Sequence, residues 1–323
     1  PTPELRKVLA DAVEFCSYFV YPDGSYAGVL GSRNTLHFYP HGFEILSAEL
    51  PMAASVADRM ARGLADGQLV PPHSMSDRYV HYRVPEFLLA ARDARPRPSP
   101  LPLLPYQRTD QRTYFPRAGI AVARHGTAYT VANLAKGGVL ASFNTTTGTR
   151  LRTDTGWLGE LANGQLVTSQ WVSTENVQRV EGTTWSVRGN LRAVPSTKLL
   201  TLEKNILFRL ALAVLGRFPP AAHWLKGNIR RTLILRSRPI ACTYERRIAC
   251  MEHALEITDE LTPTGPLTFR RLLIGGDMAI RYVPQSRFFQ QYELQTTTRM
   301  MSDQEIAQLN AGSPLRIVSK ISA

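Results

Sequence analysis

Residues 119–134, GIAVARHGTAYTVANL, are the stretch of sequence that decides the fold. Its side chains follow a period of two, which is typical of β-strands rather than helices. His125-Gly126 lies in the middle of the stretch and predicts a turn between two such runs. The stretch is therefore predicted to form two strands joined at His125-Gly126.

The same period-two alternation continues towards the end of the chain. About a dozen short strands, separated by Gly, Asn, Asp and Pro turns, are expected after residue 111, and this pattern predicts a large antiparallel β-sandwich. Residues 204–225 interrupt the pattern with a helical, strongly apolar segment. Its run of about eleven apolar-rich residues is too short to span a bilayer.

The first 95 residues carry helical signals instead. Thr2 is a suitable N-cap, with Pro3 at the first helical position and Glu4 in the first turn. Helical spacing predicts helices near residues 2–19, 42–49, 51–64 and 76–92, arranged as helical hairpins. The chain begins at Pro1 rather than Met, and the first helix starts at once, so we expect a fragment of a longer protein.

A proline-rich stretch separates the two patterns. Residues 95–105, RPRPSPLPLLP, contain five prolines in eleven residues and are expected to be extended. The sequence thus predicts an α+β multidomain chain. Its parts are a helical domain over residues 1–95, a linker over 96–110 and an antiparallel β-sandwich over 111–323.

Composition and charge narrow the classes of function. The formal net charge is +12 over 323 residues. Residues 204–247 are especially basic, which favours an acidic polysaccharide, anionic lipid headgroups or nucleic acid as partner, with a solvated basic face as the alternative. No phosphate-binding loop, serine nucleophile motif or nucleic-acid module accompanies this charge, so we expect no nucleic-acid partner. The sequence suggests no cofactor.

The three cysteines do not form a disulfide framework. Cys242 and Cys250 lie eight residues apart in a strand-like region, and Cys16 lies far away in the first helix. A bond between Cys242 and Cys250 is one interpretation, and two reduced, packed thiols are the preferred one. No cysteine spacing suggests a zinc site, and no metal is expected.

The best candidate for a functional segment is residues 23–46, DGSYAGVLGSRNTLHFYPHGFEIL. An ordinary connection between helices runs about 2–8 residues, and this one is longer. It is also dense in ionisable and amide side chains, which are typical of functional loops. The structural alternatives are that Arg33 and Asn34 cap a helix or pair with Glu44, and that residues 39–41 form a packed turn.

The combination of helical hairpins, proline-rich linker and β-sandwich resembles the heparinase II/III-like polysaccharide lyases and related alginate lyases. Two segments carry the local resemblance: residues 23–35, DGSYAGVLGSRNT, and residues 114–140, YFPRAGIAVARHGTAYTVANLAKGGVL. The resemblance implies the end of an α/α toroid followed by an antiparallel sandwich. It also implies β-elimination of an acidic, uronate-containing polysaccharide, in a periplasmic, secreted or envelope-associated protein.

A uronate lyase must neutralise the substrate carboxylate while a base removes the proton from C5. Arg33 and Asn34 suit the carboxylate, because they donate hydrogen bonds to developing charge. Four side chains are candidates for proton transfer, namely Tyr26, His37, Tyr39 and His41.

Further substrate contacts are expected from outside this loop. The resemblance suggests His125, since the family often supplies a histidine from its sandwich. Lys226, Arg230 and Arg231 would face water or an acidic glycan. Residues 204–238 could alternatively rest on a membrane surface as an interfacial helix. The alternative function is a non-catalytic glycan-binding or assembly protein of a surface-polysaccharide pathway.

Overall fold

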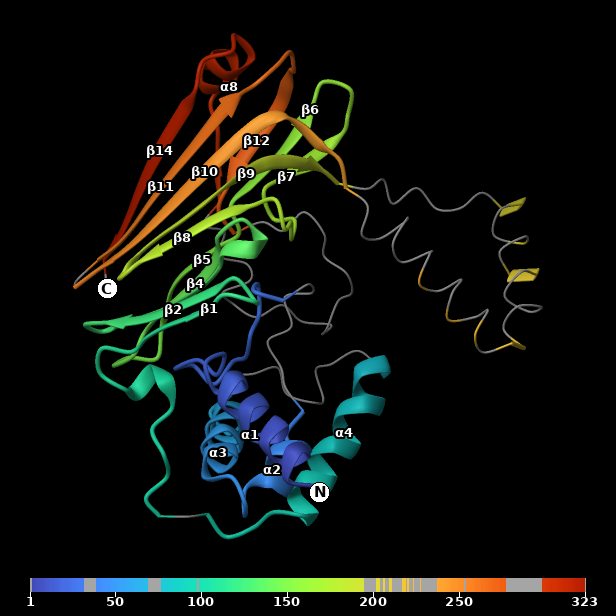
Figure 1. Ribbon diagram of the computed structural model, residues 1–323, viewed down its shortest axis with the longest axis vertical. Helices are drawn as coiled ribbons and strands as arrows, with labels where there is room; N and C mark the ends of the chain where they lie inside the picture. The colour runs from blue at the N-terminus through green and yellow to red at the C-terminus, as the bar shows by residue number, and fades with distance from the viewer. Residues whose placement is uncertain are drawn as a thin grey trace.

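The computed structural model describes residues 2–31, 39–68, 77–97, 99–194, 237–252, 254–276 and 298–322, with scattered single positions between 202 and 227. Its elements form three layers, shown in Figure 1. Helices lie at one end, a five-stranded antiparallel sheet lies in the middle, and a nine-stranded antiparallel sheet lies at the other end.

The five-stranded sheet is a simple meander in which each strand pairs with the next. Its strands are β1 (Arg112–Phe115), β2 (Ile120–His125), β3 (Ala128–Asn133), β4 (Val139–Asn144) and β5 (Arg150–Asp154). Strands β2 and β3 pair from Ile120 with Asn133 to His125 with Ala128. The predicted pair of strands joined at His125-Gly126 is therefore confirmed.

The middle sheet is buried on both faces, and the period-two pattern divides its side chains between two cores. Ile120 and Val122 belong to a core shared with the helices. Ala121 and Ala123, which alternate with them, belong to a core shared with the nine-stranded sheet. Strand β3 is buried along its whole length. The middle sheet thus links the other two layers.

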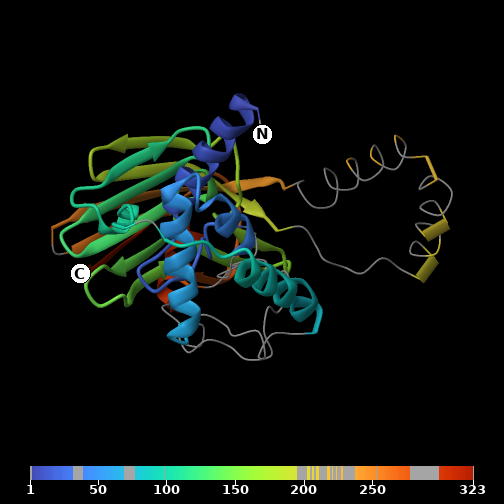
Figure 2. The ribbon, with the colours of Figure 1, turned by 90° about the horizontal axis from the view of Figure 1, so that it is seen from below.

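The helical layer covers one face of the middle sheet, and Figure 2 shows the helices lying across its strands. Its helices are α1 (Pro3–Ser17), α2 (His41–Leu46), α3 (Pro51–Ala65) and α4 (Asp77–Arg92). Thr2 caps α1 as predicted, because its hydroxyl accepts a hydrogen bond from the backbone N–H of Leu5. Val56 and Met60 of α3 are fully buried in the core that contains Tyr129.

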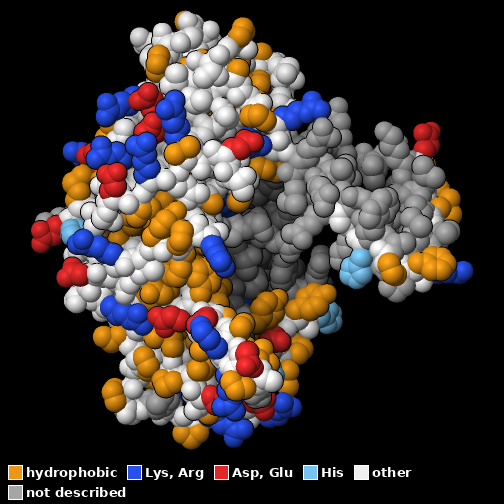
Figure 3. All heavy atoms as spheres, viewed as in Figure 1, with side chains coloured by type: hydrophobic (Ala, Val, Ile, Leu, Met, Phe, Trp, Pro, Cys, Tyr) orange, Lys and Arg blue, Asp and Glu red, His pale blue; other side chains and the backbone are white. Residues whose placement is uncertain are grey.

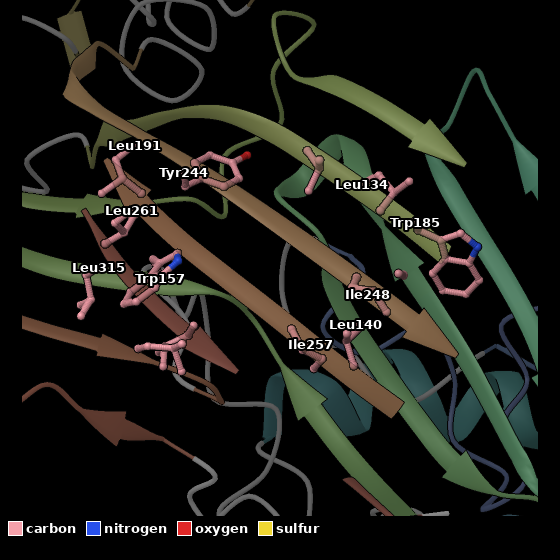
Figure 4. Close-up of a cluster of buried hydrophobic side chains, with 14 of the residues drawn as sticks. Leu134, Leu140, Trp157, Trp185, Leu191, Tyr244, Ile248, Ile257, Leu261 and Leu315 are labelled. Atoms are coloured by element: carbon pink, nitrogen blue, oxygen red, sulfur yellow. The ribbon is translucent and has the colours of Figure 1, made fainter. Parts of the chain in front are cut away.

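The nine-stranded sheet covers the other face. Its strands are β6 (Trp157–Leu161), β7 (Leu166–Thr168), β8 (Val177–Glu181), β9 (Thr184–Ala193), β10 (Pro239–Met251), β11 (Ala254–Pro263), β12 (Phe269–Ile274), β13 (Arg299–Met300) and β14 (Leu315–Ser322). The short helix α8 (Asp303–Asn310) contacts β12. Figure 4 shows Leu134 and Leu140 of the middle layer near Trp185 and Ile248 of this sheet, and Trp157 belongs to the same core.

The outer face of the nine-stranded sheet is charged. Glu260 and Arg316 are opposite each other on β11 and β14, and Lys320 forms an ion pair with Glu256 at 3.1 Å. Figure 3 shows side chains of both signs gathered over these strands. Alternation of charged outward and apolar inward residues is what a sheet with one solvated face requires.

The predicted fold class, a partial α/α toroid followed by a large antiparallel β-sandwich, is wrong. In the part of the chain that the structure describes, the helices are few and form no toroid, and the strands form two antiparallel sheets, one of them curled into a half-barrel. The physical reason lies in where the apolar helix side chains pack. Val56 and Met60, used to predict helix–helix hairpins, share a core with Val122 and Tyr129 of the sheet.

The change from helices to strands in the structure occurs across the proline-rich residues 95–105. Helix α4 ends at Arg92 and strand β1 begins at Arg112, but one hydrophobic core includes side chains from both parts. The domain division at residues 1–95, 96–110 and 111–323 stays a prediction. All three cysteines are free thiols, and burial raises the pKa of Cys242 and Cys250 to about 12.

A buried ion cluster joins the two sheets. Arg246 of β10 donates to Asp259 of β11 from Nε at 2.7 Å, and to Asp154 of β5 from Nη2 at 2.7 Å. Its Nη1 donates to the Gly138 carbonyl oxygen at 3.2 Å. Arg152 adds a further bond to Asp154 at 2.8 Å. Burial opposes ionisation of Asp154, but the two arginines lower the pKa of Asp154 overall.

Replacing Arg246 should cost far more stability than replacing its neighbour on the strand. We expect Arg246→Met to lower the free energy of unfolding by about 3–5 kcal/mol, because it leaves Asp259 buried without its cation and removes one of the two arginines that pair with Asp154. Arg247→Met on the exposed face of β10 should change it by no more than about 0.5 kcal/mol. Urea denaturation of both variants measures the difference, and equal effects would contradict the assigned role of Arg246.

Two glycines allow the loop after α1 to cross helix α3 at close range. A Cβ atom built on Gly63 would lie 2.9 Å from the Cα atom of Gly24. Gly24 itself has φ 79°, which only glycine adopts without strain. The loop that follows, which contains Tyr26, is thereby fixed against the helix.

Gly63→Ala should therefore destabilise the protein, by about 1–3 kcal/mol, because the added methyl group overpacks the crossing. The same substitution at Gly42 of α2, where an added Cβ meets nothing within 4 Å, should stabilise it by about 0.5–1 kcal/mol through helix propensity. Thermal unfolding of both variants provides the measurement. Stabilisation by Gly63→Ala would rule out the close crossing.

Candidate functional site

The predicted site residues divide into those within the described part of the chain and those outside it. Tyr26, Tyr39, His41 and His125 are described. The others lie outside the described residues, and their roles remain predictions: Arg33, Asn34, His37, Lys226, Arg230 and Arg231.

The first part of the candidate segment, residues 23–46, is fixed to the middle sheet by a buried lysine. Lys136 lies in the short 3₁₀ helix η3 (Leu134–Lys136) after β3. Its Nζ donates to the carbonyl oxygens of Val29 at 2.7 Å and Gly31 at 2.5 Å. Asn133 adds a bond to the Leu30 carbonyl oxygen at 3.2 Å. These bonds hold the loop up to Gly31.

Tyr26 belongs to the hydrophobic core rather than to a proton-transfer site. It forms an isolated β-bridge with Val20 and an edge contact with the Phe19 ring. Burial, assisted by Cys16, raises the pKa of Tyr26 well above its ordinary value. A catalytic tyrosine base needs a lowered pKa, so the packing argues for a structural role of Tyr26.

His41 is paired with an aspartate that is distant in sequence. Its Nε2 lies 2.7 Å from Oδ2 of Asp93, just past the end of α4. Arg92 donates to the same carboxylate at 2.8 and 2.9 Å, and Arg92 and His41 together lower the pKa of Asp93. An ionised carboxylate only accepts hydrogen bonds, so it selects the proton on Nε2 and leaves Nδ1 to accept one in the neutral ring.

Arg83 of α4 is a functional candidate that the sequence reasoning missed. Its side chain is 1% exposed and lies 5.7 Å from the Tyr39 ring centre and 5.2 Å from that of Phe87. Within the described residues, its Nε and Nη1 have no hydrogen-bond partner. Burial lowers the pKa of Arg83 to about 10, so it is still charged at neutral pH.

A buried guanidinium of which two nitrogens lack a partner within the described residues is unusual in a folded protein and makes Arg83 a candidate for binding an anion. Native structures satisfy nearly all buried polar groups, and an arginine fork matches a carboxylate in charge and geometry. Tyr39, whose ring lies beside Arg83, is 49% exposed. Arg83 thus lies beside Tyr39, and Tyr39 is followed two residues later by His41, which begins α2.

A second ion pair holds α2 in place. Glu44 is buried, and its two carboxylate oxygens accept from Arg97 at 2.6 and 2.7 Å. Arg97 lies in the proline-rich stretch after α4, so this stretch fastens the helix that carries His41. Among the described residues Glu44 thus pairs with Arg97, whereas Arg33 and Asn34, which one alternative interpretation of the sequence pairs with Glu44, lie outside them.

His125 lies elsewhere. It ends β2 opposite Ala128, and the adjoining Gly126 abuts the backbone of Glu252 in the turn between β10 and β11. This hairpin is at the edge of the sheets far from α2 and α4 in Figure 1. A substrate contact by His125 remains a prediction separate from the site at α2.

The described residues contain no group of three His, Cys, Asp or Glu side chains placed to hold a metal ion. Nor does any helix among them have the length and hydrophobicity needed to cross a bilayer. The chain matches no known family model and no curated protein.

The contribution of Lys136 to the free energy of unfolding should depend on pH. Burial lowers the pKa of Lys136 to about 8 from an ordinary value of 10.5. Between these values the unfolded chain binds a proton that the folded chain has lost, so the free energy of unfolding rises with pH in this window. Below about pH 8 both states are protonated and the contribution is constant.

We expect the difference in unfolding free energy between wild type and Lys136→Met to shift in favour of wild type by about 1 kcal/mol from pH 8 to pH 9. Urea denaturation at both pH values measures this shift. A shift in the opposite direction would mean that the two carbonyl oxygens hold the ammonium form more strongly than burial opposes it.

Proposed function

We propose that this protein cleaves an acidic, uronate-containing polysaccharide by β-elimination, in the manner of the heparinase II/III-like lyases. The observation that carries the proposal is the buried guanidinium of Arg83, whose Nε and Nη1 have no partner within the described residues. It lies beside Tyr39, which comes two residues before the histidine held by Asp93. The proposal does not depend on a toroid, because these groups come from α2, α4 and the residues next to them.

Arg83 supplies the group that the chemistry needs first. The proton on C5 of a uronate becomes acidic only when the adjacent carboxylate is neutralised, since charge accumulates there as the proton leaves. The Nε and Nη1 of Arg83 have no hydrogen-bond partner within the described residues, and each can donate a charge-assisted hydrogen bond to a carboxylate oxygen. Binding a carboxylate would also satisfy donors that are otherwise buried without partners.

His41 and Tyr39 supply proton transfer. The base takes the C5 proton, the electrons of the C5–H bond form the C4–C5 double bond, and the C4–O bond breaks. The departing oxygen takes a proton from the acid, so the products are an unsaturated uronate and a free hydroxyl group. His41, oriented by Asp93, suits the base, and the half-exposed hydroxyl-bearing ring of Tyr39 suits the acid.

The direct test follows the unsaturated uronate by its ultraviolet absorbance with heparan sulfate, alginate and hyaluronan as substrates. His41→Ala should lower kcat/KM about 10²–10⁴-fold, as expected for loss of a general acid or base. His81→Ala, which removes an exposed histidine of α4, should leave it unchanged. Turnover unaffected by His41→Ala would disprove the assigned role.

Arg83→Met separates a binding role from a structural one. It should lower kcat/KM about 10²–10³-fold, yet leave the free energy of unfolding equal or higher, because it removes a buried charge that forms no ion pair within 4.0 Å among the described residues. Arg95→Met, at an exposed position nearby, is the control. A large loss of stability with Arg83→Met would instead assign this arginine to the core.

Binding of a polymer without turnover would favour the alternative, a non-catalytic glycan-binding or assembly protein. Arg83 would serve that function too, since recognition of a uronate carboxylate needs the same guanidinium donors. In that case His41→Ala would leave binding unchanged while Arg83→Met weakened it.

A further inference from the structure

A groove of about 740 Å³ lies on the other side of the helical layer, between α3 and the middle sheet. One wall comes from α3 and the residues after it, a second from residues 101–107, and a third from the turn between β4 and β5. None of its lining residues belongs to the site at Tyr39, His41, Arg83 and Asp93. Its volume falls within the range of about 300–1,000 Å³ that is usual for ligand sites.

The walls of this groove are polar and carry an excess of positive charge. Arg59, Arg62 and Arg124 line it together with Asp58 and Asp66. Asp58 is already paired with Arg62 at 3.0 Å. The remaining side chains therefore leave the groove with one more positive than negative charge, so an anionic group is the favoured occupant.

Arg124, near the end of β2, offers an unused donor. Its Nη1 donates to the Gln107 carbonyl oxygen at 2.7 Å, which fixes the guanidinium in place. Its Nε is buried and has no hydrogen-bond partner within the described residues. A held arginine with a free N–H is suited to bind a carboxylate or sulfate oxygen.

The turn between β4 and β5 adds hydroxyl groups. Thr145, Thr146 and Thr147 all line the groove. The turn is rigid, because the backbone N–H groups of Thr146 and Thr147 both donate to Oδ1 of Asn144, at 2.9 and 3.0 Å. Tyr106, which also lines the groove, is 7% exposed and therefore offers no open ring face for stacking a base.

We propose that this groove is a second binding site, which takes a short segment of an acidic glycan. Hydroxyl groups of threonine and arginine N–H groups pair with sugar hydroxyls and with a carboxylate or sulfate on the same chain. The choice of a glycan rests on the proposed function, whereas the site itself rests on the groove. The segment held here would belong to the polymer but lie away from the bond that is cleaved.

The test measures binding of hexasaccharides of hyaluronan, which carry carboxylates, and of chondroitin sulfate, which add sulfates, by isothermal titration calorimetry. Neutral cellohexaose is the uncharged control. Thr146→Glu places a negative charge in the groove at an exposed turn position and should weaken binding of the acidic hexasaccharides about tenfold or more. Thr174→Glu puts the same charge at an exposed turn position outside the groove lining and should have a much smaller effect.

Arg124→Met should weaken the same binding about tenfold, since a charge-assisted hydrogen bond is lost. If Arg124→Met weakens binding of the hyaluronan and chondroitin sulfate hexasaccharides equally, the groove is a general anion site. If it weakens binding of only one of them, that result identifies the anion that Arg124 binds. Unchanged binding in both Thr146→Glu and Arg124→Met, or equal binding of cellohexaose, would overturn the proposal.

The two proposals fail separately. If Thr146→Glu weakens binding but no polymer is cleaved, the proposed glycan site in the groove stands and the proposed lyase activity is rejected. If His41→Ala lowers turnover but Thr146→Glu leaves binding unchanged, the proposed lyase activity stands and the proposed glycan site is rejected.

Discussion

The contact between Arg246, Asp154 and Asp259 is the constraint on which the arrangement of the sheets depends. One guanidinium on β10 holds carboxylates from both sheets and a backbone oxygen just before β4. Charges this deeply buried are tolerated only when their geometry is satisfied. A shift of one residue in the register of β10 would turn Arg246 to the solvated face and leave the carboxylates unpaired. The cluster therefore fixes which faces of the two sheets meet.

The position of the candidate site follows from this arrangement. The middle sheet carries Lys136 at the end of β3, and Lys136 holds the backbone of Val29 and Gly31. On the helical side, Arg97 holds Glu44 of α2, and Asp93 orients His41. Reactive side chains that lie on short connections thus gain rigidity from ion pairs to neighbouring elements, which is the support that a preorganised site requires.

The sequence predicted local elements well and their partners poorly. The paired strands on either side of His125-Gly126 and the Thr2 cap follow from neighbouring residues, and both are present. The toroid was wrong because the period of an apolar helix face does not say whether a sheet or another helix covers it. The loop containing His41 was chosen for its composition, but its partner Asp93 lies 52 residues away. Arg83 could have been found from its spacing to Phe87 on α4, since residues four apart share a helix face.

The middle sheet, buried on both of its faces, has a consequence for how the chain folds. Neither core is complete until strands β2 to β4 are in place, because each strand gives alternate side chains to each core. Their meander is built from contacts between close neighbours in sequence, which form quickly. Once formed, it exposes apolar side chains on two sides at once, and the helices and the large sheet each cover one of them. Unfolding of either outer layer uncovers the same strands, so the described layers are expected to melt as one cooperative unit.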